Sequence, residues 1–435
     1  MRIIRYVLHQ SLWMAILCTF LFATVSFSQT KEIIAEGAYN MGDGETPMIA
    51  ESRSVLQAKR TALEQAGTYV ESYSKVKNFQ LTEDEIKVIA SGLIEVTILD
   101  KKRTIIGDGL NFWVKIKAVV QLEKMEEMAA RVKEKSVVED YKRIQEAYDK
   151  GQKEIEELKR QLAQAKGEKE KRRVEARLTK EERLFQADEW FEKGYNYSLN
   201  KEYDKAIEVF TNAIQLDPNY SKAYNNRGAA YYKKGQYDRA TEDYTNAIQL
   251  DPNNSKAYNN RGVAYGRKGQ YDRAIEDYNR AIQLDPNDGD AYYNRGNAYV
   301  RKGQYDRAIQ DYSKAIQLNP NYAEAYNNRG FAYDRKGQYD RVIEDYSKAI
   351  QLNPNFAEAF NNRGVAYYKK GQYDRAIEDY SKAIQLNPNY AEAFNNRGNA
   401  YSKKGQYDRA ILDFQKACDM GSEEGCRFLR NLERR

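Results

Sequence analysis

The chain has 435 residues, with 70 lysines and arginines against 64 aspartates and glutamates, for a net charge of +6 at pH 7. This length leaves room for several domains, and the near balance of charge gives no strong argument for nucleic acid as a partner. The single histidine, His9, lies close to the amino terminus, so histidine-based triads and general bases are excluded from the rest of the chain.

Residues 1–28 have the pattern of a secretory signal peptide. Two arginines precede a mostly apolar run from Leu12 to Phe27, and small serines end the segment. We therefore predict cleavage before Gln29 and a periplasmic or secreted mature protein. The alternative is an uncleaved membrane anchor at residues 7–27, although the apolar run is short for a membrane span.

Residues 29–122 predict a compact α+β domain of order βααββ. Strands are expected at 33–39, 96–106 and 112–120, and helices at 46–76 and from the Thr82–Glu85 capping box through Leu93. The domain resembles the amino-terminal domain of flagellar assembly protein T and related small bacterial envelope proteins. That resemblance implies an envelope context and no catalysis.

Residues 123–186 predict a charged helical connector. Its apolar residues keep heptad spacing at Tyr141, Ile144, Tyr148, Ile155, Leu158, Leu162 and Ala165. Such a stripe predicts either a short coiled coil that forms a homodimer through residues 141–165, or a solvated single helix that acts as a spacer and is supported by charge pairs along its surface.

From residue 187 onward the chain repeats itself every 34 residues, as its prolines show: Pro218, Pro252, Pro286, Pro320, Pro354 and Pro388. In each period two apolar stripes at helical spacing flank a glycine-containing turn, which predicts a helix–turn–helix hairpin. One such hairpin cannot bury its apolar face alone, so the hairpins are expected to stack into an array.

These units resemble the tetratricopeptide repeat. The first unit carries the signature of that family best, at Trp190, Gly194, Tyr197, Ala206, Phe210 and Pro218. The resemblance implies seven units at 187–220, 221–254, 255–288, 289–322, 323–356, 357–390 and 391–424. The predicted fold class is therefore mainly α: an α-solenoid of seven helix–turn–helix repeats, preceded by the α+β domain and the helical connector.

Three positions depart from the pattern of the family or of the sibling units. The family's leucine before the glycine is Lys193 in the first unit and arginine in the others. The seventh unit has Ser422 in place of the proline. Val342 stands where the sibling units have alanine, so we predict a local misfit in helix packing, because two extra methyl groups must be accommodated there.

The tail contains the last two cysteines, in the stretch KACDMGSEEGC. This stretch resembles Sel1-type repeats, relatives in which cysteines at this spacing bridge adjacent helices. The resemblance and an oxidising compartment together predict a disulfide between Cys418 and Cys426, with a cap helix at 425–435. The alternative is two free thiols.

No chemistry of catalysis is evident in the sequence. The two cysteines are too few for a metal site of the His/Cys kind, and no glycine-rich phosphate-binding motif occurs. Acidic pairs such as Glu242–Asp243 recur at one position in four of the units and are interpreted as part of a solvated helix face. We therefore predict no enzyme activity, no cofactor and no metal.

The resemblance to tetratricopeptide repeats also implies a binding surface, because in that family the first helices line a concave face. One fixed position there holds Asn226, Asn260, Asn294, Asn328, Asn362 and Asn396. A matching asparagine row in O-linked N-acetylglucosamine transferase holds the main chain of an extended peptide, and an amide suits this role because it both donates and accepts. The alternative is a structural hydrogen bond to the next repeat.

A second row is basic and consists of Lys233, Arg267, Arg301, Arg335, Lys369 and Lys403. These residues are expected to contact acidic side chains or a terminal carboxylate, or alternatively to complement the dipole at the helix ends. The first unit has Glu192 and Leu199 instead, so both rows begin at the second unit.

We therefore predict a non-catalytic scaffold of the cell envelope that binds an extended peptide or protein segment in its concave groove, with neither nucleic acid nor metal as a partner. Two alternatives remain. One is a structural envelope or assembly protein, in which the repeats act as a spacer. The other is an accessory subunit of a secretion or cell-wall complex.

Overall fold

The computed structural model of the protein describes residues 30–433 except 43–46, 77–79, 107–108, 122–123 and 134. The predicted signal segment at 1–28 and its alternative, a membrane anchor at 7–27, lie outside the described residues. None of the described helices is both long and apolar enough to cross a membrane. The chain divides into two compact units, one ending at Asn219 and the other beginning at Tyr220.

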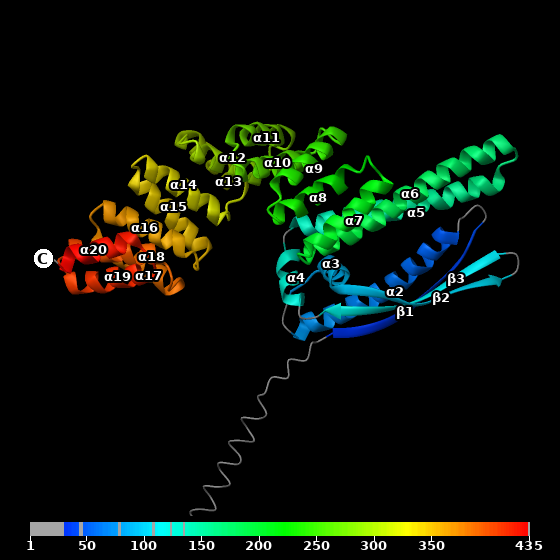
Figure 1. The fold of residues 1–435 in the computed structure, drawn as a ribbon, viewed down its shortest axis with the longest axis horizontal. Helices are drawn as coiled ribbons and strands as arrows, with labels where there is room; N and C mark the ends of the chain where they lie inside the picture. The colour runs from blue at the N-terminus through cyan, green and yellow to red at the C-terminus, as the bar shows by residue number, and fades with distance from the viewer. Residues whose placement is uncertain are drawn as a thin grey trace, which may run out of the picture. The chain divides into compact units, whose positions relative to one another are not determined.

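The first unit begins with the predicted βααββ domain (Figure 1). Its elements are β1 (Thr30–Asn40), α2 (Pro47–Val76), α3 (Glu83–Leu93), β2 (Ile94–Ile106) and β3 (Gly109–Gln121). Strand β3 lies between β1 and β2 and is antiparallel to both. The predicted capping box of Thr82 and Glu85 opens α3.

Helix α2 covers one face of this sheet, and the core of the domain lies between them. Alternate residues of β3, such as Ile116 and Ala118, are buried against small residues of α2, such as Ala62. Gly37 of β1 makes the close approach possible, because a Cβ at this position would lie 2.0 Å from the carbonyl oxygen of Ser54. Because every second side chain of β3 is buried on the same face, that face is the one that α2 covers.

The first unit continues with helices that pack beside this domain. They are α4 (Met125–Val132), α5 (Lys135–Gln164), α6 (Glu168–Leu199) and α7 (Tyr203–Leu216). Helices α5 and α6 form an antiparallel hairpin (Figure 1). Helix α6 runs without a break from the predicted connector into the first helix of the first repeat, so residue 187 marks no break in the helix.

The apolar stripe of residues 141–165 is buried within the chain, which corrects both expectations for the connector. Ile155 and Leu158 pack in one cluster with Val174 and Leu178 of α6. The stripe is therefore neither a seam open to a second chain nor a solvated face, and the predicted homodimer would need a different surface. Sequence periodicity shows that a stripe needs a partner, and it does not show which segment supplies that partner.

The second unit consists of six helical hairpins and a cap. First helices are α8 (Ser221–Lys233), α10 (Ser255–Arg267), α12 (Gly289–Arg301), α14 (Ala323–Arg335), α16 (Ala357–Lys369) and α18 (Ala391–Lys403). Second helices are α9 (Tyr237–Leu250), α11 (Tyr271–Leu284), α13 (Tyr305–Leu318), α15 (Tyr339–Leu352), α17 (Tyr373–Leu386) and α19 (Tyr407–Asp419). The cap is α20 (Glu423–Glu433), and the predicted disulfide between Cys418 and Cys426 joins it to α19.

Each hairpin closes around a glycine that faces an aromatic ring. A Cβ at Gly296 would lie 2.7 Å from Cε1 of Tyr312, so only glycine lets the two helices pack at this distance. In the fifth repeat the corresponding distance, from Gly330 to Cε1 of Tyr346, is 3.1 Å. Val342 is fully buried in that repeat, and the local misfit predicted there stays a prediction.

Candidate peptide-binding groove and a pocket in the first unit

A ladder of buried ion pairs connects the two helices of each repeat in the second unit. In the fourth repeat, Nε and Nη2 of Arg295 donate to the two carboxylate oxygens of Asp311 at 2.8 and 2.6 Å. The other pairs are Arg227–Asp243, Arg261–Asp277, Arg329–Asp345, Arg363–Asp379 and Arg397–Asp413. Asp243 is buried, so the interpretation of the recurring acidic pair as a solvated face is wrong for its aspartate.

The same arginines also connect consecutive repeats. Nη1 of Arg329 donates to the hydroxyl of Ser313 in the preceding repeat at 3.0 Å, and Arg363 and Arg397 make the equivalent contact. A bidentate pair of this kind fixes geometry as well as charge. The departure from the family's leucine is therefore a structural feature that holds the first helices in register.

The predicted asparagine row lies partly exposed on these first helices. Its amides bond to the preceding repeat at several positions, as the structural alternative predicted. Nδ2 of Asn260 donates to Oδ1 of Asn225 at 3.1 Å, and Asn294 and Asn396 make the equivalent bond.

Other members of the row differ. Nδ2 of Asn328 donates to Oη of Tyr293 and to Oδ1 of Asn297, and Oδ1 of Asn362 accepts from Asn361. Asn226 bonds to the carbonyl of Lys222 in its own helix. Each of these amides is thus engaged in a hydrogen bond, and an amide keeps capacity for further bonds because it carries two donors and an acceptor.

The basic row lies exposed in the last turns of the first helices, where cations complement the helix dipole. Its members contact the preceding repeat in different ways. Nε of Arg267 donates to Oη of Tyr232 at 2.9 Å, whereas Nζ of Lys369 pairs with Asp334 at 2.7 Å. Arg335 donates to Oη of Tyr305, and Lys233, Arg301 and Lys403 complete the row.

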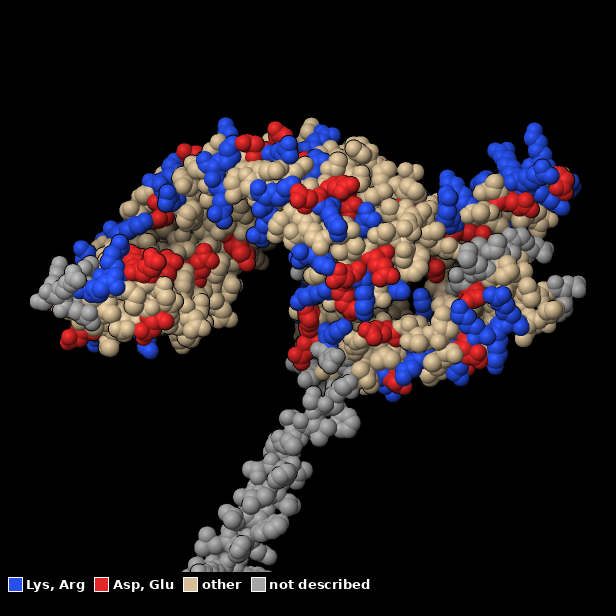
Figure 2. All heavy atoms as spheres, viewed as in Figure 1, with Lys and Arg blue, Asp and Glu red and all other residues tan. Residues whose placement is uncertain are grey.

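Acidic and basic side chains alternate over the repeats on the face that Figure 2 shows. A further ladder of ion pairs contributes to this mixing, with Lys268, Lys302, Lys336, Lys370 and Lys404 each paired to an aspartate of the preceding repeat. Exposed pairs of this kind stabilise a fold only weakly. On this face, lysines and arginines are mixed with aspartates and glutamates over the repeats.

The first helices form a hollow in the second unit, referred to here as the groove pocket. It has a volume of about 580 Å³ and is lined by residues of the first helices α8, α10, α12 and α14 and by Tyr271 and Tyr278 of the second helix α11. Two residues of the asparagine row, Asn294 and Asn328, and two of the basic row, Arg267 and Arg301, line it. The fold thus brings members of both predicted rows into one cavity, although they come from different repeats.

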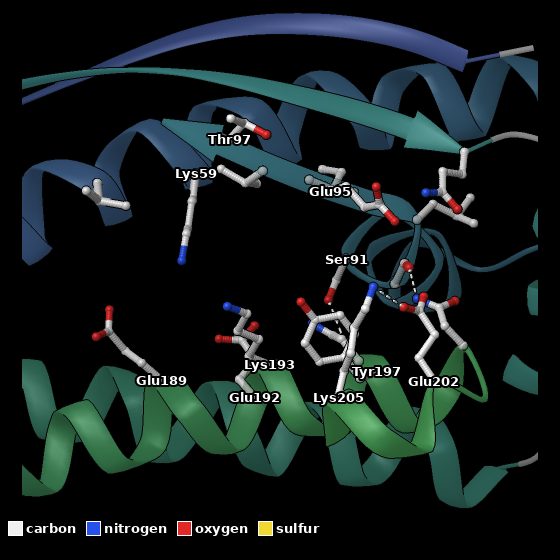
Figure 3. Close-up of a pocket in the computed structure, with 18 of the residues that line it drawn as sticks. Lys59, Ser91, Glu95, Thr97, Glu189, Glu192, Lys193, Tyr197, Glu202 and Lys205 are labelled. Atoms are coloured by element: carbon white, nitrogen blue, oxygen red, sulfur yellow. Dashed lines mark hydrogen bonds and ion pairs between the residues drawn. The ribbon is translucent and has the colours of Figure 1, made fainter. Parts of the chain in front are cut away.

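A second pocket, of about 510 Å³, lies within the first unit and was not predicted. Figure 3 shows Lys59 of α2 pointing toward Glu189, Glu192 and Lys193 of α6, with Glu95 of β2 on the neighbouring wall. The sequence did not predict this pocket because the residues that line it are far apart along the chain. Glu192 occupies the position that holds asparagine in later repeats, which was the one available signal.

Burial dominates the electrostatics of this pocket. Burial raises the pKa of Glu189 to about 7, against an opposing effect of Lys59. Burial likewise raises the pKa of Glu192, whose carboxylate accepts a hydrogen bond from Nε2 of Gln145 at 3.0 Å. Desolvation lowers the pKa of Lys193. The pocket therefore holds two carboxyl groups whose pKa values are raised, that of Glu189 to about 7. Its lining residues include no nucleophile paired to a base.

Profiles of one family match the repeats. A profile described as TPR repeat matches residues 194–235, 267–303, 296–337, 333–371 and 366–405. Two profiles described as tetratricopeptide repeat match 221–254 and 391–420, and 243–276. Together they cover residues 194–420, which is more than half of the chain. The chain belongs to the tetratricopeptide repeat family.

Several solved tetratricopeptide repeat structures are similar to this chain. MamA is 32% identical over 37% of this chain and 94% of its own, with a TM-score of 0.36. YrrB, described as a TPR protein with an unusual peptide-binding site, is 28% identical over 43% of this chain and 96% of its own, with a TM-score of 0.38. No curated protein matches the chain.

A tetratricopeptide repeat protein from Parabacteroides merdae is 25% identical over 57% of this chain and 96% of its own, with a TM-score of 0.44. The tetratricopeptide repeat is generally a non-catalytic interaction scaffold. The resemblances of residues 29–122 to flagellar assembly protein T and of the tail to Sel1-type repeats stay predictions.

Proposed function

We propose that this tetratricopeptide repeat protein is a non-catalytic scaffold that binds an extended peptide or protein segment along its first helices. The observation that carries the proposal is the groove pocket, in which amides and guanidinium groups from consecutive repeats converge. Amides suit the main chain of any peptide, and guanidinium groups suit acidic side chains or a terminal carboxylate.

The proposal includes a place in the cell envelope, which rests on the signal pattern of residues 1–28 and on the oxidised state of Cys418 and Cys426. Disulfides persist in oxidising compartments outside the cytoplasm. Amino-terminal sequencing of the native protein should place its first residue near Gln29. A membrane fraction in which Met1 is retained would contradict this location.

A triple substitution tests the role of the asparagine row. Peptides selected from a display library on the full chain serve as probes, and their affinity is measured for Asn294→Ala with Asn328→Ala and Asn362→Ala. Each lost hydrogen bond costs about 0.5–1.5 kcal/mol, so affinity should fall roughly 100- to 1,000-fold if the effects add.

The matched control replaces three exposed asparagines in the turns of the same repeats, Asn321, Asn355 and Asn389. It should leave both affinity and Tm close to those of the native chain. If the test variant instead keeps its affinity while its Tm collapses, the asparagine row only connects repeats and the groove does not bind a peptide main chain.

A further inference from the structure

One first-helix position differs among the otherwise similar repeats of the second unit. It holds Tyr232, Gly266, Val300, Asp334, Tyr368 and Ser402 in chain order. The position lies one residue before the basic row, in the last turn of each first helix. Only in the third repeat does it lack a side chain, and the groove pocket lies at this glycine.

Where this position is not a tyrosine, the tyrosine that begins the second helix of the same repeat has no ring from this position to stack on, and the third repeat is one of four such repeats. Tyr232 packs against Tyr237 and Tyr368 packs against Tyr373, in both cases with ring centroids 5.4 Å apart. The counterpart of Tyr237 and Tyr373 in the third repeat is Tyr271. Among the described residues no ring packs against Tyr271, which lines the groove pocket instead.

The same position also supplies a hydrogen-bond acceptor to the following repeat. Oη of Tyr232 accepts from Nε of Arg267, and the carboxylate of Asp334 pairs with Lys369. In both pairs the acceptor lies 35 residues before the basic residue. The residue 35 positions before Arg301 is Gly266, which has no side chain to accept a hydrogen bond. Within the described part of the chain Arg301 forms no hydrogen bond or ion pair, and it lines the same pocket.

The pocket thus lacks one aromatic ring beside Tyr271 and one oxygen acceptor beside Arg301. We propose that the groove pocket over Gly266 is a subsite for a tyrosine side chain of the bound peptide. The ring of that tyrosine stacks on Tyr271, and its hydroxyl accepts a hydrogen bond from Arg301, as Tyr232 accepts from Arg267. The subsite rests on the proposed function, since the tyrosine is carried by a peptide that the first helices hold.

Other side chains satisfy only part of this environment. A phenylalanine would stack but would leave Arg301 without an acceptor, and an aspartate would pair with Arg301 without covering Tyr271. Asp and Glu are absent from the lining of the pocket, so the only charges beside the ligand are the guanidinium groups of Arg267 and Arg301. A neutral phenol oxygen next to a guanidinium group forms a charge-assisted hydrogen bond.

Gly266→Tyr fills the subsite from within the chain. Two sibling repeats carry tyrosine at this position, and a Cβ on Gly266 would meet only Oη of Tyr278, at 3.9 Å. The fold should therefore accept the substitution with an unchanged or higher Tm. Peptides selected from a display library on the native full chain should be enriched in tyrosine at one position, and Gly266→Tyr should bind them about 10- to 100-fold more weakly, because the ring can no longer be buried.

Two further variants separate the ring from the hydroxyl. Replacing the tyrosine of a selected peptide by phenylalanine should weaken binding to the native chain about 10-fold, and this difference should disappear in Arg301→Met. Gly266→Ala, which leaves most of the pocket open, is the matched control and should bind close to the native level. Tyr368→Gly should open an equivalent hollow beside Tyr373 and add affinity for peptides with a second tyrosine.

The outcomes distinguish the subsite from the proposed function. Peptide binders without a tyrosine preference, bound equally by the native chain and Gly266→Tyr, would overturn the subsite and leave the groove function standing. If the library gives no binders, the groove function fails, and N-acetyltyrosinamide is then titrated by ligand-observed NMR. Saturable binding that Gly266→Tyr abolishes supports the subsite, and its absence or an equal signal in both proteins overturns it.

Discussion

The first tetratricopeptide repeat and the later ones share a hairpin but use its surface differently. In the first, a Cβ on Gly194 would lie 2.5 Å from Cε1 of Phe210, the same close packing that Gly296 and Tyr312 show. Yet Lys193 and Val209 stand where the later repeats have their buried arginine and aspartate. The glycine and the aromatic ring are therefore enough for the two helices to pack, and the arginine–aspartate ion pair is not required for the hairpin itself.

What differs is the surface against which each hairpin packs. In the first unit, residues 189–205 of the hairpin and its turn line a pocket with α2, α3 and β2. In the second unit, hairpins pack against near-copies of themselves, and the arginines from Arg261 to Arg397 contact both their own repeat and the preceding one, as Arg329 does. The buried ion pair recurs in each repeat of the second unit, where it sets the same geometry each time.

The ion pair offers the largest test of this comparison. Asp311→Ala removes one partner and leaves the guanidinium group of Arg295 buried without its carboxylate, which should destabilise the repeat by about 3–5 kcal/mol. Arg295→Leu with Asp311→Val, residues close to those that the family and the first repeat use, should recover most of the loss. Denaturant unfolding of the native chain, Asp311→Ala and the double variant measures these free energies. An equal loss of stability in the single and the double variant would contradict the proposed role of the ion pair.

The two ends of the array are also closed differently. The first repeat continues a long helix of the first unit, whereas the last is closed by α20 and the disulfide. Cys418→Ser with Cys426→Ser should destabilise this cap by about 2–3 kcal/mol, since the closed loop is small. Hydrogen exchange should increase in α19 and α20 and stay unchanged in α8 to α13, because repeat arrays unfold locally. Uniform acceleration along the unit would be inconsistent with a local cap.

The glycine–ring contact sharpens the comparison among later repeats. Gly296→Ala places a Cβ 2.7 Å from the ring of Tyr312 and should cost about 1–3 kcal/mol. Gly330→Ala should cost less, because the corresponding distance is 3.1 Å beside Val342. Thermal unfolding of the two variants decides the order. Equal losses would show that the wider spacing in the fifth repeat is of no energetic consequence.

The smallest expected effect concerns the pocket of the first unit. The folded pKa of Glu189, about 7, lies above its ordinary value of 4.5. Its protonated form is favoured on folding, so its contribution is present below pH 4.5 and is lost as the pH rises through about 7. Glu189→Gln should therefore make the free energy of unfolding fall less steeply between pH 5 and pH 8. Glu175→Gln, exposed on the same helix, is the control and should leave that fall unchanged.

Much of the fold could be predicted because its signals are local. A glycine after each first helix of the second unit adopts a positive φ, as at Gly235 with +74°, and the Thr82 capping box marks where α3 begins. Strand alternation likewise identified β3. The candidate rows were also correctly placed on the first helices, since a 34-residue period brings equivalent residues to equivalent positions.

The sequence by itself thus determined the repeats, their packing residues, the βααββ order and the pairing of two nearby cysteines, all of which depend on neighbours in the chain or on periodicity. Only the tertiary structure decided which segment covers the stripe of α5, where Asp243 and its siblings lie, and that Gly266 opens a pocket. Those features depend on contacts between side chains 16 or more residues apart. The spacing of residues in the sequence is compatible with many packing partners, and only the packing of the folded chain shows which segment each side chain contacts.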